Sequence, residues 1–234
     1  MKLLLTSNGI SNATIRTGLV DLLGKPIEES SALLVVSGMH PFAGGSTRVV
    51  DLIKGTSANK LCGIGWKSLG LLEPTALASV RREVLSEELA QADALLVFGG
   101  HVAFLAHWMR QCGLAELLPK LDNLVYVGVS AGAIVTTPFN CDAEFNAVTL
   151  PEDTDIPTAV DGGLGFVDFT TWVHVGNPDP MFSDHTLKNT ESFANEVGAR
   201  TYALDDESAL SVQNGVVTIL TEGQCSYFDP ALKP

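Results

Sequence analysis

Short apolar runs alternate with longer segments of mixed apolar and polar residues over the first two-thirds of the chain. Short apolar runs are typical of buried strands, whereas longer mixed segments are typical of amphipathic helices. The pattern predicts strands at residues 2–6, 32–37, 67–72, 94–98 and 124–129. It predicts helices near residues 12–23, 48–53, 83–91, 102–111 and 114–120. This alternation, with strands that are apolar along most of their length, indicates a parallel sheet covered by helices on both faces.

The last third of the chain has a different pattern. Polar segments between residues 140 and 160 predict loops, and residues 166–175 predict a further strand. Residues 216–221 and 224–228 predict a closing C-terminal β-hairpin. No internal repeat and no Pro/Gly/Ser-rich linker interrupts the 234 residues, so we predict one α/β domain over residues 1–234.

The charge balance narrows the classes of partner. The chain has 14 Lys and Arg against 27 Asp and Glu, a formal net charge of −13 at pH 7. A surface of this sign repels nucleic-acid phosphates and anionic lipid headgroups. No apolar stretch reaches transmembrane length, and the N-terminal run is better explained as a strand than as a signal peptide. We therefore expect a cytoplasmic protein that binds neither nucleic acid nor membranes.

The four cysteines are far apart and form no Cys-x-x-Cys pair: Cys62, Cys112, Cys141 and Cys225. This spacing argues against a zinc ribbon and against a redox dithiol. A chain that is 46% hydrophobic can build a core without disulfides.

The candidate chemistry begins at Ser130, in the run Gly128-Val-Ser-Ala-Gly132 between a predicted strand and an apolar helical stretch. In this context a Gly-x-Ser-x-Gly sequence predicts a nucleophile elbow, a sharp turn that exposes the serine hydroxyl. The backbone N–H of Ala131 could then bind a developing oxyanion. The alternative interpretation is a Gly/Ser-rich turn without chemistry.

A second oxyanion donor is expected from the Gly-Gly turn after the strand at 94–98. Gly100 has no side chain to keep its N–H away from a substrate oxygen. Such loops lie at the carboxyl ends of parallel strands, which is where ligands bind in open α/β sheets. A tight turn with no further role is the alternative.

A serine nucleophile requires a base, and five histidines are candidates. His40 and His107 are interpreted as structural or solvated, and His185 as a surface residue in a polar loop. His101 follows the Gly-Gly turn and could face the cleft. His174 ends an apolar strand and follows the serine in sequence, so it is the preferred base.

The base in turn requires an orienting acid. Asp205, Asp206 and Glu207 lie together between two apolar segments. Their rivals lie in the polar segment that follows the serine turn: Asp142, Glu144, Asp153 and Asp155. The residue pattern alone does not choose among them.

Together, these motifs resemble peptidase family S51, the aspartyl dipeptidase (peptidase E) group to which cyanophycinase is related. The resemblance covers most of the chain and rests on the order and spacing of several short segments. They are Leu3–Gly9 with Asn12, residues 22–26, the Gly-Gly turn with Phe104-Leu105, Arg110 with Gly113-Leu114, residues 128–135, residues 163–169, His174 and residues 204–210.

The resemblance implies a flavodoxin-like three-layer sandwich with a mostly parallel central sheet, of the class I glutamine amidotransferase-like type. It also implies a Ser–His–acid apparatus without metal or cofactor, with Ser130 as nucleophile and His174 as base. Asp206 aligns with the acid that orients the histidine in cyanophycinase. Asp142 is the nearest equivalent of the aspartate assigned that role in the dipeptidase, and Glu207 stays open.

Three positions depart from the family pattern at the expected rim of the site, and one of them is Val173, which precedes His174 where the family often has a proline. Lys188 falls where the dipeptidase group carries an arginine, and it lacks the bidentate fork that suits a carboxylate. His101 replaces the asparagine of a Gly-Gly-Gly-Asn sequence. We expect His101 and Lys188 to contact the substrate and to alter its selection.

The resemblance and the motifs predict a serine exopeptidase that hydrolyses short peptides through an acyl-enzyme on Ser130. Dipeptides with N-terminal Asp are the candidate substrates, and a monomer or a homodimer is expected. The alternatives are a catalytically silent small-ligand-binding protein on the same scaffold, and an esterase or amidase.

Overall fold

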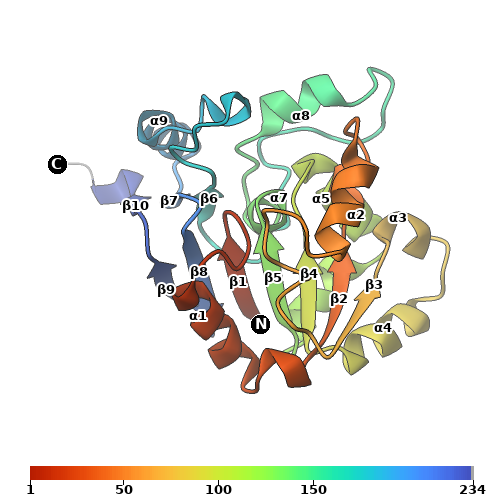
Figure 1. The fold of residues 1–234 in the computed structure, drawn as a ribbon. Helices are drawn as coiled ribbons and strands as arrows, with labels where there is room; N and C mark the ends of the chain where they lie inside the picture. Colours follow the sequence, from red (N-terminus) through yellow and green to blue (C-terminus); the bar gives the residue numbers. More distant parts are fainter. Residues whose placement is uncertain (233–234) are drawn as a thin grey trace.

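A central sheet organises the protein, and the computed structural model describes it within residues 1–232 (Figure 1). Its strands are β1 (Lys2–Thr6), β2 (Ser31–Val35), β3 (Ser68–Leu71), β4 (Ala94–Val97), β5 (Val125–Val129), β8 (Ser208–Gln213) and β9 (Val216–Thr221). They lie in the order β3-β2-β4-β5-β1-β8-β9. The first five are parallel, whereas β8 is antiparallel to β1 and to β9. β1 therefore lies where the direction of the sheet changes.

Helices cover both faces of this sheet. They are α1 (Ala13–Leu23), α2 (Gly45–Ile53), α3 (Pro74–Leu77), α4 (Arg82–Gln91), α5 (Val102–Gln111), α6 (Leu114–Leu117), α7 (Ala131–Ile134), α8 (Ala143–Thr149) and α9 (Leu187–Val197). Successive strand residues point to opposite faces. Leu4 joins the core that includes apolar residues of α1 and α2, while Leu3 and Leu5 join the core that includes those of α4 and α5. This produces the expected three-layer α/β arrangement.

The helix ends follow from local sequence. The Asn12 side chain accepts a hydrogen bond from the Ile15 N–H at the start of α1, and Gly24 ends that helix in the left-handed conformation. The Thr186 hydroxyl accepts from the Asn189 N–H in the same way at the start of α9. These caps satisfy N–H groups that have no partner within their own helix.

A second, smaller sheet is formed by the last third of the chain. Its strands are β6 (Thr170–Trp172), β7 (Thr201–Leu204) and β10 (Cys225–Phe228), in the order β10-β7-β6. The predicted hairpin of residues 216–221 with 224–228 is therefore wrong in its pairing. β9 pairs with β8 across the turn at Asn214-Gly215, where both residues have positive φ, and β10 pairs with β7 in the other sheet.

The polar segment between residues 140 and 160, predicted as loops, also contains the helix α8. No helix within residues 1–232 is both long enough and apolar enough to cross a membrane.

The central position of β1 leads to a prediction about stability. Leu4→Ala removes a fully buried side chain from the core and is expected to lower the free energy of unfolding by about 2–5 kcal/mol. The matched control is Leu71→Ala, because Leu71 ends β3 of the same sheet and its side chain is 59% exposed. That variant should change stability by less than about 0.5 kcal/mol. Urea denaturation of both variants tests the difference, and equal losses would contradict the packing described here.

Candidate active site

The serine turn lies at the carboxyl end of β5. Ser130 has φ 54° and ψ −118°, a strained conformation for a residue with a side chain. The turn requires glycine on both sides, because a Cβ at Gly128 would lie 2.3 Å from the Gly132 oxygen and a Cβ at Gly132 would lie 2.0 Å from the Val97 oxygen. The Ser130 N–H donates to the Thr6 oxygen at 3.0 Å, which ties the turn to β1.

His174 and Asp206 complete a hydrogen-bonded chain with this serine. His174 Nε2 lies 2.9 Å from Ser130 Oγ, and His174 Nδ1 lies 2.6 Å from Asp206 Oδ1. His174 follows β6, and Asp206 precedes β8, so two different sheets supply the two residues. The His174 side chain is 8% exposed and that of Asp206 is 25% exposed. The chain of groups is therefore largely, but not fully, shielded from water.

Ser7, directly after β1, connects the two partners of the serine. The His174 backbone N–H donates to Ser7 Oγ at 2.8 Å, and the Ser7 hydroxyl donates to Asp206 Oδ1 at 2.8 Å. Asn177 donates from its side-chain amide to the other carboxylate oxygen of Asp206. Three donors thus converge on one carboxylate, which fixes its orientation.

These contacts determine the direction of the hydrogen bonds. A backbone N–H can only donate, so the single hydroxyl proton of Ser7 is free to go to Asp206. His174 Nδ1 can then donate to the ionised carboxylate, which leaves a lone pair on Nε2 to accept the Ser130 proton. This is the tautomer that a general base requires.

The charge state of Asp206 agrees with this direction. Burial by itself would raise the pKa of this carboxyl group. The hydrogen bonds from His174, Ser7 and Asn177 outweigh burial and hold the pKa of Asp206 below its ordinary value.

The backbone and one aromatic ring hold His174 in place. His174 has φ 57°, an uncommon value for a residue with a side chain, and its N–H is anchored by Ser7 as described above. The Phe182 ring stacks on the imidazole at a centroid distance of 4.2 Å with 24° between the planes. The ring covers one face of the imidazole, so the histidine has little freedom to turn away from Ser130.

The two rival acids lie elsewhere. The Glu207 carboxylate accepts from the Asn12 side chain and is exposed. Asp142 approaches a different histidine, His185, with 4.0 Å between Oδ1 and Nε2. Of the three acids left open by the sequence, the structure brings Asp206 into hydrogen-bond contact with His174.

The Gly-Gly turn lies against the serine. A Cβ at Gly99 would lie 3.0 Å from the Ser130 Cβ, and Gly100 has φ 120°. Among the residues that the structure describes, the N–H groups of Gly100 and Ala131 have no hydrogen-bond partner. Both therefore remain available to a substrate oxygen.

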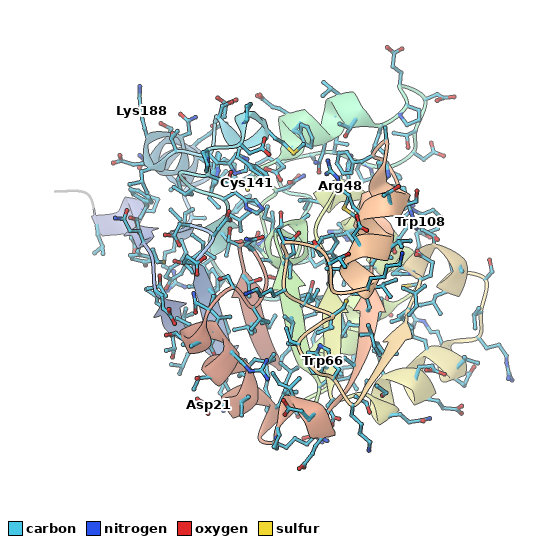
Figure 2. The ribbon with its side chains drawn as sticks, viewed as in Figure 1. Asp21, Arg48, Trp66, Trp108, Cys141 and Lys188 are labelled. Carbon is cyan, nitrogen blue, oxygen red and sulfur yellow. The ribbon has the colours of Figure 1, made fainter. Side chains whose placement is uncertain are left out.

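His101 and Lys188 do not lie where the sequence led us to expect. His101 is fully buried. Its Nδ1 accepts from the Phe104 N–H at the start of α5, and its Nε2 contacts the backbone oxygen of Asn146. Lys188 is exposed and extends outward from α9 at the edge of the molecule (Figure 2). Neither residue lines the cavity at Ser130. His101 instead caps a helix, and the helical geometry of α9 turns Lys188 toward solvent.

A cavity of about 1060 Å³ opens beside Ser130 and His174. Its described lining includes the aromatic rings of Phe42, Phe145 and Phe182. Arg48 on α2 is the one Lys or Arg among the described lining residues (Figure 2). Seven carboxylates also line it: Asp51, Asp142, Glu144, Asp179, Asp184, Glu196 and Asp206. The cavity is large enough for a short peptide and is strongly acidic.

The sequence alone did not reveal several of these residues. The residue pattern gives no role to Ser7 or Asn177, places Arg48 in a helix and predicts His185 at the surface. The sequence does contain a signal for Ser7: it directly follows a buried strand, and the carboxyl ends of parallel strands meet at one edge of the sheet. Within residues 1–232, no three His, Cys, Asp or Glu side chains cluster in a way that could hold a metal ion.

The parallel sheet and the strained serine turn at its edge define an α/β protein of the nucleophile-elbow type. The chain belongs to peptidase family S51, whose model matches residues 3–220, and it is a serine-type peptidase. An uncharacterized peptidase of Listeria monocytogenes is 28% identical over 155 residues, which are 63% of this chain and 70% of that protein.

Two solved structures share the fold. One is a candidate peptidase E from Listeria monocytogenes EGD-e, with a TM-score of 0.64 and 18% identity, over 95% of this chain and 98% of that one. The other is a peptidase from an acI-B1 Actinobacterium, with a TM-score of 0.62 and 13% identity, over 98% of this chain and 91% of that one.

The lowered pKa of Asp206 makes the stability of the site dependent on pH. At pH values above the ordinary pKa of a carboxyl group, the ionised form of Asp206 stabilises the folded state. This contribution is lost as the pH falls through the lowered pKa that Asp206 has in the folded state. Asp206→Asn should therefore lower the melting temperature at neutral pH, and the difference from the wild type should shrink toward about pH 3. Thermal melts across this range test the expectation. Asp153→Asn, on an exposed loop, is the control, and a deficit for Asp206→Asn that is independent of pH would contradict it.

Proposed function

We propose that this protein is a serine exopeptidase that hydrolyses short peptides through an acyl-enzyme on Ser130. The observation that carries the proposal is the 2.9 Å contact between Ser130 Oγ and His174 Nε2. A hydroxyl is a weak nucleophile unless an adjacent base removes its proton. The direction of the hydrogen bonds through Ser7 and Asp206 supports His174 as that base.

The reaction proceeds in two halves. Ser130 Oγ attacks the scissile carbonyl carbon while His174 Nε2 takes the hydroxyl proton, and the negative charge moves to the carbonyl oxygen. The free N–H groups of Ala131 and Gly100 bind this oxyanion. The C–N bond then breaks, His174 returns the proton to the leaving amine, and the acyl-enzyme remains.

Water completes the cycle. It attacks the acyl carbon while His174 takes one of its protons. The collapse of the second tetrahedral intermediate then breaks the bond to Oγ, His174 returns the proton to Oγ, and the carboxylic acid is released. Asp206 remains ionised throughout and stabilises the imidazolium that forms in each half. Phe182, stacked on the imidazole, adds a cation–π contribution to the same state.

Dipeptides with N-terminal Asp are the first substrates to consider. A side-chain carboxylate needs a cation in this acidic cavity, and Arg48 is the described lining residue able to supply it. Its guanidinium offers the bidentate geometry that a carboxylate prefers. Arg48 lines the cavity and Lys188 does not, which favours the arginine over the lysine in this role.

Replacing the proposed nucleophile tests the function directly. Ser130→Ala should reduce kcat at least about 1000-fold on any dipeptide that the wild type cleaves, because no acyl-enzyme can form. A panel of Asp-X and other dipeptides, followed by amine release, provides the measurement. A fluorophosphonate probe should add its mass to wild-type Ser130 and should not label the variant.

Different outcomes would point to other functions. Cleavage of esters without cleavage of any peptide would favour an esterase. Absence of turnover in the wild type, together with saturable binding of a peptide, would favour a silent binding protein.

Ser7 is expected to act through His174 and Asp206 rather than on the substrate. Ser7→Ala removes the acceptor of the His174 N–H and one donor to Asp206, so kcat should fall about 10- to 100-fold with little change in KM. Because the pKa of Asp206 would rise, the acidic limb of the kcat/KM profile should also move to higher pH. Ser86→Ala on the exposed face of α4 is the matched control. An unchanged kcat with an unchanged pH profile would contradict this role.

A further inference from the structure

We propose that Asp142 and His185 form a binding site for a primary ammonium group of the substrate. Both residues line the cavity that contains Ser130, and His185 Nε2 lies 4.0 Å from Asp142 Oδ1. The inference rests on the proposed peptidase function and names a substrate group that the function by itself leaves open. It also gives Asp142 a role other than that of the acid beside His174.

The carboxylate of Asp142 has no strong donor. Asp142 is the N-cap residue of α8, a position at which an aspartate side chain normally accepts from the backbone of its helix. Here the side chain makes no capping hydrogen bond. The Cys141 thiol lies 3.9 Å away, but it also lies 3.6 Å from the Thr171 oxygen and has a single weak proton. Among the described residues, no N–H or O–H group donates a hydrogen bond to the carboxylate.

His185 presents a second acceptor to the same space. Its Nδ1 lies 2.6 Å from the Val173 carbonyl oxygen, which can only accept, so Nδ1 carries the proton. In neutral His185 the lone pair is therefore on Nε2, the atom that faces Asp142. A separation of 4.0 Å is too long for a direct hydrogen bond. The two acceptors face each other without a donor between them.

A primary ammonium group fits this arrangement. It has three donors and a full positive charge, and its nitrogen can lie about 2.9 Å from both acceptors at once. The rings of Trp172 and Phe182 pack against His185 at centroid distances of 5.9 and 5.2 Å. Apolar surroundings strengthen an ammonium–carboxylate contact, because they keep water out of it. Burial raises the pKa of Asp142, and a cation beside this carboxylate would favour its ionised form.

The site lies near the proposed reaction centre. The ring centroids of His185 and His174 are 6.4 Å apart, with Phe182 in contact with both rings. A peptide has two possible sources of a primary ammonium group here, its α-amino terminus and a lysine side chain. The chemistry is shared, so the experiment has to separate the sources.

Binding to Ser130→Ala tests the site without turnover. By calorimetry, Asp-Leu should bind at least about tenfold more tightly than N-acetyl-Asp-Leu, because acetylation removes the charge and two donors. Adding Asp142→Asn should weaken the binding of Asp-Leu about 10- to 100-fold and leave the acetylated peptide unchanged. Asp153→Asn in the same background is the charge-matched control, since Asp153 is exposed and does not line the cavity. N-acetyl-Lys-Leu gives the second arm: binding that depends on Asp142 would assign the site to a side-chain ammonium.

The outcomes separate this inference from the proposed function. Equal binding of free and acetylated peptides to Ser130→Ala, or equal weakening of both by Asp142→Asn, would overturn the ammonium site. The acetylation comparison requires no change at Asp142, so it holds even if that variant folds poorly. Conversely, a wild type that binds peptides through their ammonium group but never cleaves them would overturn the peptidase proposal and leave the site standing.

Discussion

The pairing of β1 with β5 on one side and β8 on the other is the constraint on which the site depends. Thr6 lies opposite Val129 in the parallel ladder and opposite Ala209 in the antiparallel one. Ser7 and Ser130, each one residue further along, therefore emerge side by side at the same edge. Because β8 runs the other way, the residues that precede it arrive at this edge, which is how Asp206 reaches Ser7. A slip of one residue in either ladder would move these side chains to opposite faces.

The same topology explains the order of the residues in the chain. In a conventional α/β-hydrolase the acid precedes the histidine in sequence. Here Asp206 comes after His174, since it enters the edge at the start of an antiparallel strand rather than at the end of a parallel one. His174 comes from the smaller sheet, just after β6, and its N–H is anchored on the central sheet by Ser7. One hydroxyl thus holds together groups from two sheets.

The sequence was sufficient for the parts of the protein that depend on local pattern. The apolar runs located the parallel strands within a residue or two, and the two glycines around Ser130 predicted the sharp turn. The sequence was insufficient where strands far apart in the chain pair with each other. β9 pairs with β8 in the central sheet, whereas β10 pairs with β7 in the smaller sheet. The hydrophobic periodicity of a strand does not indicate which sheet the strand joins. Ser7 is an ordinary polar residue directly after a strand. Its role follows only from the register of β1 with β5, which places it beside Ser130. The Gly-Gly turn and the resemblance predict that His101 contacts the substrate, and the resemblance predicts the same of Lys188. In the structure, helix capping decides the position of His101 and the helical geometry of α9 decides that of Lys188.

The two aspartates near His174 illustrate how environment separates like groups. Asp206 receives three hydrogen bonds, and its pKa falls despite burial. Asp142 receives none from an N–H or O–H group in the described chain, and its pKa rises. An acid that orients a base has to be ionised and satisfied before substrate arrives, because it must not compete for the substrate's charge. A carboxylate that binds a cation is most useful in the opposite condition, poorly solvated and unsatisfied until the ligand supplies the missing donors. Natural proteins retain such destabilised groups where function requires them. The contrast between the two carboxylates therefore supports the proposal that they have different roles in one cavity.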